Sequence, residues 1–181
     1  MRIADWTPDR KRQPEDLVDA IVARRGGQLL NLDKALLWSE PVARGWNIFM
    51  RDVRNGLSTD RRLQELAICT VALVTGAIYE FHHHAPDFLA AGGEQRQLDA
   101  LQRWIAGAMP EDGTDSDWTQ VEWMVVQFAT QITRDLQVSD SLFAEMREHF
   151  DETQIVEFTV AIAAYNMVAR ILKTLRIEPE T

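Results

Sequence analysis

One stretch of the sequence predicts the fold class of this chain. It runs from Arg61 to Ala91 and reads RRLQELAICTVALVTGAIYEFHHHAPDFLAA. Its apolar residues recur at helical spacing on both sides of Gly76, which predicts two helices that meet at this glycine. Because glycine adopts the left-handed backbone conformation that ends many helices, we expect the chain to reverse there. The first helix is predicted to start at a cap formed by Ser58 or Thr59, and the second to run from Ala77 to about Ala91.

Outside this stretch the apolar periodicity is helical nearly everywhere, and the alternation typical of β-strands is hard to find. The segment Pro110–Ser116 is rich in proline, glycine and short polar residues, which indicates a surface loop. The chain is therefore predicted to be all-α, with one domain over residues 1–181. Further helices are predicted at residues 14–25, 32–38, 39–55, 94–108, 117–135, 140–150 and 151–175.

The composition restricts the partners and the compartment. The net charge of −9 repels phosphate backbones and anionic lipid surfaces, which argues against nucleic acid and membranes as partners. No apolar run reaches the roughly 18 residues that span a bilayer, and no apolar segment follows the basic N-terminus as in a secretory signal. Cys69 is the only cysteine, so an intrachain disulfide and a cysteine-only metal site are excluded. We expect a cytoplasmic protein.

Candidate chemistry lies in the second predicted helix, where three of the four histidines are adjacent. Successive side chains on a helix point about 100° apart, so these histidines cannot act as one triplet. Glu80 with His84, and His83 with Asp87, are spaced by one turn and can interact. A carboxylate one turn from an imidazole orients the ring and makes it more basic, which is useful for acid/base catalysis near neutral pH.

The preceding helix supplies a second acidic group. Glu65 shares a stripe with the small residues Cys69, Ala72 and Gly76, so another helix can approach it closely. If the chain reverses at Gly76, Glu65 lies about 16 Å before the turn and His84 about 12 Å after it, at about 1.5 Å per residue. A cluster of Glu65, Glu80 and His84 across a helical hairpin is therefore feasible.

The segment from Gln64 to His84, with TGAIYEFHHH at residues 75–84, resembles the signature of the carboxymuconolactone decarboxylase and alkylhydroperoxidase D superfamily. In the redox branch, a glutamate lies 12 residues before a Cys-x-x-Cys, and a histidine follows its second cysteine by four. These positions correspond to Glu65 and His84, whereas the two cysteines are replaced by Ala77 and Glu80. The resemblance covers roughly residues 30–176, with the motif in 58–92, and includes the closing helix at 151–170.

Because the dithiol is absent, peroxidase or disulfide reductase chemistry through Cys-x-x-Cys is excluded. The chain instead resembles the non-redox branch, whose decarboxylases act on a lactone carrying a removable carboxylate. The resemblance implies an alkylhydroperoxidase-like fold, no metal and no organic cofactor, and a homotrimer or homohexamer. The nearly uniformly apolar last helix also suggests packing between subunits.

Each candidate residue also has a purely structural interpretation. His84 suits a buried histidine bonded to Glu65 or Glu80, and Glu80 suits the favourable start of a helix. Glu65 suits an exposed ion pair with Arg61 or Arg62. Further candidates have either binding or packing roles: Tyr79 as a hydrogen-bond donor, His83 with Asp87 as chance metal ligands, and Asn166 with Arg170 as a substrate clamp or an ordinary hydrogen-bond network.

Three functional hypotheses follow. The first is a cofactor-independent lyase or decarboxylase of a small lactone or carboxylated substrate, in which His84 shuttles a proton, Glu80 orients it and Glu65 tunes it. The second is a helical oligomeric module that binds a small ligand and catalyses nothing. The third, a peroxidase with Cys69 alone as nucleophile, lacks any evident activating group.

Overall fold

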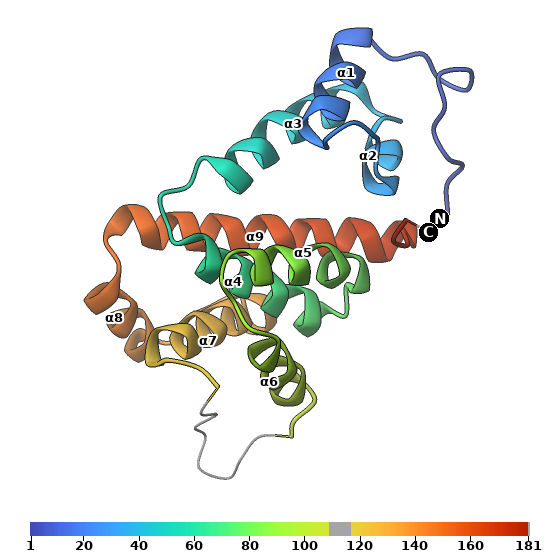
Figure 1. Ribbon diagram of the computed structural model, residues 1–181. Coiled ribbons are helices and arrows are strands. Elements are labelled where there is room, and N and C mark those ends of the chain that lie inside the picture. The colour runs from blue at the N-terminus through green and yellow to red at the C-terminus, as the bar shows by residue number, and fades with distance from the viewer. Residues whose placement is uncertain (109–116, 181) are drawn as a thin grey trace. The chain divides into compact units, whose positions relative to one another are not determined.

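A computed structural model describes residues 1–108 and 117–180, and these parts of the chain contain helices and no strand (Figure 1). The predicted all-α class is confirmed, and most helix ends lie within three residues of the predicted ones. The predicted loop Pro110–Ser116 lies outside the described residues. The helices are α1 (Glu15–Arg24), α2 (Asn31–Leu36), α3 (Glu40–Asn55), α4 (Arg61–Thr75), α5 (Ile78–Ala90), α6 (Gln95–Ile105), α7 (Gln120–Asp135), α8 (Asp140–His149) and α9 (Glu152–Leu175).

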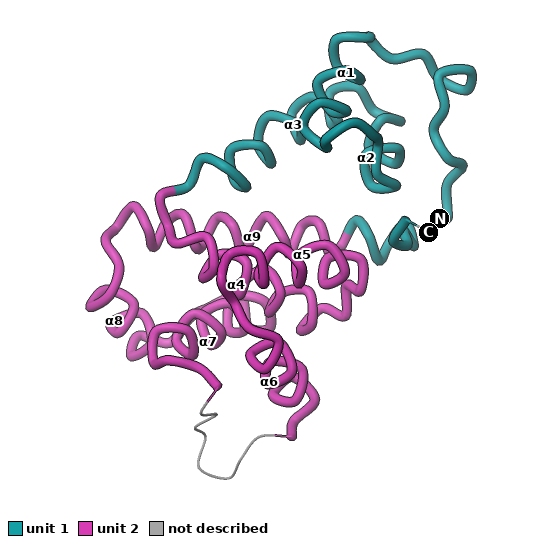
Figure 2. Tube along the Cα trace, viewed as in Figure 1, with its two compact units in different colours: residues 1–57, 171–181 teal, residues 58–170 magenta. Residues whose placement is uncertain are grey.

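The helices group into two compact units, coloured separately in Figure 2. The first unit comprises Met1–Leu57 and Ile171–Thr181, and within it α3 packs against α1 and α2. Its buried Asp33 pairs with Arg24 at 3.1 Å and with Arg25 at 2.8 Å, which compensates the buried carboxylate. The organisation as one domain stays a prediction.

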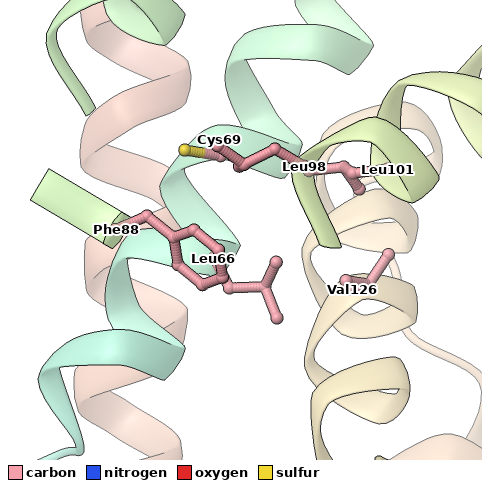
Figure 3. Close-up of a cluster of buried hydrophobic side chains, with 6 residues drawn as sticks. All are labelled: Leu66, Cys69, Phe88, Leu98, Leu101 and Val126. Atoms are coloured by element: carbon pink, nitrogen blue, oxygen red, sulfur yellow. The ribbon is translucent and has the colours of Figure 1, made fainter. Parts of the chain in front are cut away.

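The second unit, Ser58–Arg170, is built around α4. This helix packs against α5, α6 and α7, and every residue from Leu63 to Ala72 is buried. A helix buried on all sides leaves no face for water, so any polar side chain on it needs a partner within the protein. Figure 3 shows one apolar cluster that joins α4 to its neighbours, formed by Leu66, Cys69, Phe88, Leu98, Leu101 and Val126.

The two ends of α4 set the register of the α4–α5 hairpin. The predicted cap at Ser58 or Thr59 is wrong: Asp60 caps the helix by accepting from the Leu63 amide at 3.0 Å. The backbone amides of Ser58 and Thr59 instead donate to the Glu157 carboxylate. The predicted reversal at Gly76 is confirmed.

The reversal itself is a Schellman turn. Gly76 has φ of 65°, in the left-handed region, and the Ala77 amide donates to the Ala72 carbonyl at 2.8 Å. A side chain at position 76 would strain this conformation, so the glycine specifies the point at which the chain turns. Helices α4 and α5 consequently run antiparallel and in contact.

Helix α9 is the one described helix that is long and apolar enough, by length and composition alone, to cross a membrane. The sequence predicted no membrane-spanning segment, because polar residues interrupt the apolar runs of this helix. However, 56% of its most apolar window is buried inside the protein, including Phe158 and Ile162. A core helix meets the same criterion. Val156, Val160 and Met167 remain exposed along it, and the expected homo-oligomer stays a prediction.

Candidate functional site

Two stripes of chemically active side chains meet across the α4–α5 hairpin, with residues one or two turns apart on each helix. Because the helices are antiparallel, the first residue of one stripe lies near the last of the other. The stripes are Arg61, Glu65 and Cys69 on α4, and Glu80, His84 and Asp87 on α5.

The central contact joins Glu65 to His84. Nδ1 of His84 lies 2.6 Å from Oε2 of Glu65, and the two side chains are 4% and 0% exposed. An ionised carboxylate only accepts hydrogen bonds, so we assign the proton to Nδ1 of the neutral ring, which leaves Nε2 as the basic nitrogen. The predicted meeting of Glu65 and His84 is therefore found, but Glu65, not Glu80, orients the ring.

Arg61 and Asp87 form the solvent-facing end of the site. The Arg61 guanidinium makes an ion pair with Oε1 of Glu65 and lies 4.0 Å from Oδ2 of Asp87. Their side chains are 39% and 38% exposed, so they connect the buried pair to solvent. The interpretation of Glu65 as an exposed partner of Arg61 is wrong in one respect, because Glu65 itself is fully buried.

Glu80 is a buried acid of a different kind. Among the described residues, neither of its carboxyl oxygens has a hydrogen-bond partner. Burial raises the pKa of Glu80 to about 9, because a carboxylate loses its hydration in the protein interior. The side chain is therefore neutral near pH 7. Since its oxygens accept no bond from His84, it cannot be the group that orients the imidazole.

The other two histidines of the run make aromatic contacts on α5. The ring of His83 packs at 4.5 Å from Tyr79 and at 5.2 Å from His82. His82 is exposed, as the 100° spacing of helical side chains predicts. Tyr79 and His83 therefore contact each other within α5.

Asn166 and Arg170 take part in an ordinary hydrogen-bond network, which was one of the two interpretations drawn from the sequence; the other was a substrate clamp. The Asn166 amide donates to the Thr133 hydroxyl at 2.9 Å, and Arg170 donates to the Asn166 carbonyl at 2.7 Å. Helix α9 instead contributes Tyr165, whose ring packs edge-on against His84 at 4.7 Å. No sequence signal distinguishes Tyr165 in a helix that is apolar almost all round.

Cys69 has the environment of an unreactive thiol. It is fully buried, and its pKa is raised well above the ordinary value, first by loss of hydration and then by the nearby charges of Glu65, Asp87 and Glu80. A reactive cysteine needs a stabilised thiolate, and this site disfavours one.

One group of side chains in the described part of the chain could hold a metal. Ligand atoms of Glu65, His84 and Asp87 all lie within 4.8 Å of one another. The structure groups Asp87 with His84 at i and i+3, and the pairing of Asp87 with His83 at i and i+4 stays a prediction. A cavity of about 240 Å³ lies elsewhere, within the first unit, and is lined in part by Trp6 and Arg12.

Comparison with known proteins supports the fold. No family model matches the sequence, and no curated protein matches it. Among solved structures, the chain is similar to an uncharacterized peroxidase-related protein from Silicibacter sp. TM1040, with a TM-score of 0.74 and 16% sequence identity. The match covers 98% of this chain and 88% of the other. At this identity the likeness shows a shared helical fold and leaves the function of this chain to be proposed from the site.

Proposed function

We propose that this protein catalyses proton transfer on a small carboxylated or lactone-like substrate, as a lyase or decarboxylase that needs no cofactor. The observation that carries the proposal is the 2.6 Å contact between Nδ1 of His84 and Oε2 of Glu65. A carboxylate that accepts from one ring nitrogen holds the tautomer and leaves the other nitrogen to exchange protons with a substrate. His84 would be the proton carrier and Glu65 its positioning residue.

Arg61 suits the role of an anchor for the substrate carboxylate. Its guanidinium presents a planar fork of donors, and it already lies between the carboxylates of Glu65 and Asp87. A substrate carboxylate could replace Asp87 in this contact, because both partners are partly exposed. Such an exchange would bring the scissile bond towards His84 without displacing Glu65.

The proposed reaction balances as follows. The bond between the substrate carbon and its carboxylate breaks, carbon dioxide leaves, and the electron pair stays on the carbon. The imidazolium of His84 donates its Nε2 proton to that carbon, and solvent returns a proton to the ring. General acid catalysis of this kind contributes on the order of 10²- to 10⁴-fold in rate. Glu80, neutral near pH 7, would add no charge to compete with the substrate anion.

We also infer that the chain belongs to the carboxymuconolactone decarboxylase-like superfamily, in the branch that lacks the dithiol. The spacing of Glu65 and His84 about Gly76 supports this, together with the fold shared with a peroxidase-related protein. Peroxidase activity is the weaker candidate for this chain, because Cys69 is buried with a raised pKa. We further propose that the protein is a homo-oligomer and is located in the cytoplasm. Light scattering measures the oligomeric state.

The non-catalytic ligand-binding module remains the second candidate, and one observation favours it. Glu65 and His84 are almost fully buried, as expected of a polar network that only stabilises the hairpin. In that case the pair would have no exchange with solvent and no small molecule would reach Nε2.

A screen of β-keto acids and small lactones for release of carbon dioxide separates the two candidates. The proposal predicts turnover that His84→Ala lowers at least 100-fold, while His82→Ala, which removes an exposed histidine two residues away, leaves it unchanged. Circular dichroism checks that both variants are folded. An unchanged rate in folded His84→Ala would refute the assignment.

A further inference from the structure

The α4–α5 hairpin also holds a group of side chains able to bind a metal cation. The ligand atoms of Glu65, His84 and Asp87 lie within 4.8 Å of one another, and they come from two helices whose register Gly76 specifies. Two carboxylates and an imidazole are the side chains that first-row divalent metals bind. Glu65 and His84 are held by their mutual contact, and the partly exposed Asp87 provides a route from solvent.

The site already attracts a cation. The guanidinium of Arg61 reaches both Glu65 and Asp87 from one turn before Glu65. Glu80 lies on the same stripe of α5, one turn before His84, and is buried with no hydrogen-bond partner for either oxygen among the described residues. A proton neutralises this buried carboxyl near pH 7, so Glu80 adds no charge, and the negative charge of the site comes from Glu65 and Asp87.

The geometry fits a metal after a small adjustment. Ligand atoms about 2.1 Å from a tetrahedral zinc ion lie about 3.4 Å from one another. Nδ1 of His84 and Oε2 of Glu65, now 2.6 Å apart, would have to separate by about 0.8 Å, and ligand atoms as far as 4.8 Å apart would have to approach by up to about 1.4 Å. Three protein ligands would fill three of the four tetrahedral positions of a zinc ion, and water or a substrate takes the fourth in catalytic zinc sites.

We propose that Glu65, His84 and Asp87 form a binding site for a divalent first-row metal ion, which displaces the guanidinium of Arg61 towards solvent. The ion takes over the neutralising role of Arg61. Its binding at Nδ1 requires the neutral imidazole of His84 in the tautomer that carries its proton on Nε2. This inference departs from the metal-free expectation drawn from the family resemblance and does not rest on the proposed function. Because the metal would occupy Nδ1 of His84 and Oε2 of Glu65, it would replace the contact that holds the ring for proton transfer and would inhibit that reaction.

Titration calorimetry with zinc chloride on the full chain, stripped with a chelator, tests the site directly. We expect one ion per chain, with affinity lowered at least about tenfold by His84→Ala and by Asp87→Asn. Arg61→Met removes the competing cation and keeps an unbranched side chain, so it should strengthen binding several-fold. Unchanged affinity in any of these three variants, or no stoichiometric binding by the wild type, overturns the proposal.

The adjacent histidines provide the necessary control, because His82 and His83 are themselves able to attract zinc. The double variant His82→Ala/His83→Ala should bind one ion with wild-type affinity. Loss of binding in that variant would place the ion on the histidine run and overturn the proposal. The titrations need no substrate, so their failure is distinguishable from failure of the proposed reaction, which His84→Ala tests by turnover in chelator.

Discussion

Glu65 and His84, 19 residues apart in the sequence, meet across the α4–α5 hairpin through a 2.6 Å contact between Oε2 and Nδ1. The same antiparallel register places Arg61 4.0 Å from Asp87. It follows from three features: the Asp60 cap, the left-handed Gly76 and the burial of α4 from Leu63 to Ala72. The acid/base pair is thus a consequence of how the hairpin is closed.

The first prediction concerns the coupling between the two residues. His84→Ala removes one partner of the buried Glu65 carboxylate and should lower the free energy of unfolding by about 3 kcal/mol. The double variant Glu65→Ala/His84→Ala also removes the Glu65 carboxylate. Its decrease in the free energy of unfolding should therefore be smaller than the sum of the decreases in the two single variants. Urea unfolding of the four proteins measures this, and strictly additive losses would show that the two side chains do not interact.

The second prediction concerns Glu80 and pH. Its pKa is about 9 in the folded protein and near 4.5 when exposed, so the folded state holds a proton that the unfolded state releases between these values. Stability from this group is full below about pH 4.5 and is lost as the pH rises towards 9, by up to about 1.4 kcal/mol per pH unit.

Glu80→Gln cannot ionise, so the advantage of this variant over the wild type should grow between pH 5 and pH 9 and then level off. Melting temperatures across this range provide the measurement. If the melting temperatures of the two proteins changed with pH in parallel, the pKa of Glu80 would not be raised in the folded protein, and the prediction would be contradicted.

The third prediction concerns the thiol of Cys69. Because the residue is fully buried and its pKa is raised, Ellman's reagent should fail to label it in the native protein and should label it stoichiometrically in guanidinium. Cys69→Ser should leave peroxide consumption at the background rate of the wild type. Rapid labelling of the native thiol would reopen the one-cysteine peroxidase hypothesis.

The fourth prediction compares two glycines. A Cβ at Gly93 would lie 2.3 Å from the ring of the fully buried Phe88, so Gly93→Ala should destabilise the protein by about 1–3 kcal/mol. A Cβ at Gly45, within α3, meets nothing within 4 Å, and Gly45→Ala should stabilise by about 0.5–1 kcal/mol. Equal effects on thermal unfolding would contradict the packing around Phe88.

Much of the architecture could be predicted from local pattern. Helical periodicity and the position of Gly76 are properties of neighbouring residues, so the hairpin and the meeting of Glu65 with His84 were within reach of the sequence. The cap of α4 was predicted wrongly because Ser58 and Thr59 are bound by Glu157, which is 99 residues from Ser58 in the chain.

The remaining errors at the site have the same origin. Helical spacing made Glu80 the natural partner of His84, but burial keeps Glu80 neutral and Glu65 makes the contact instead. Tyr165 packs on His84 from a helix with no distinguishing pattern of its own. Tertiary packing, which a single sequence does not display, decides which of several plausible pairs forms.

The most direct test of the central claim is nitrogen NMR of the imidazole rings in protein labelled with ¹⁵N at histidine. The account predicts one ring, absent from the spectrum of His84→Ala, whose Nδ1 keeps its proton in the neutral form and loses this preference in Glu65→Gln. A His84 signal that is identical in wild type and Glu65→Gln would show that Glu65 does not hold the ring, and would contradict the proposed acid/base pair.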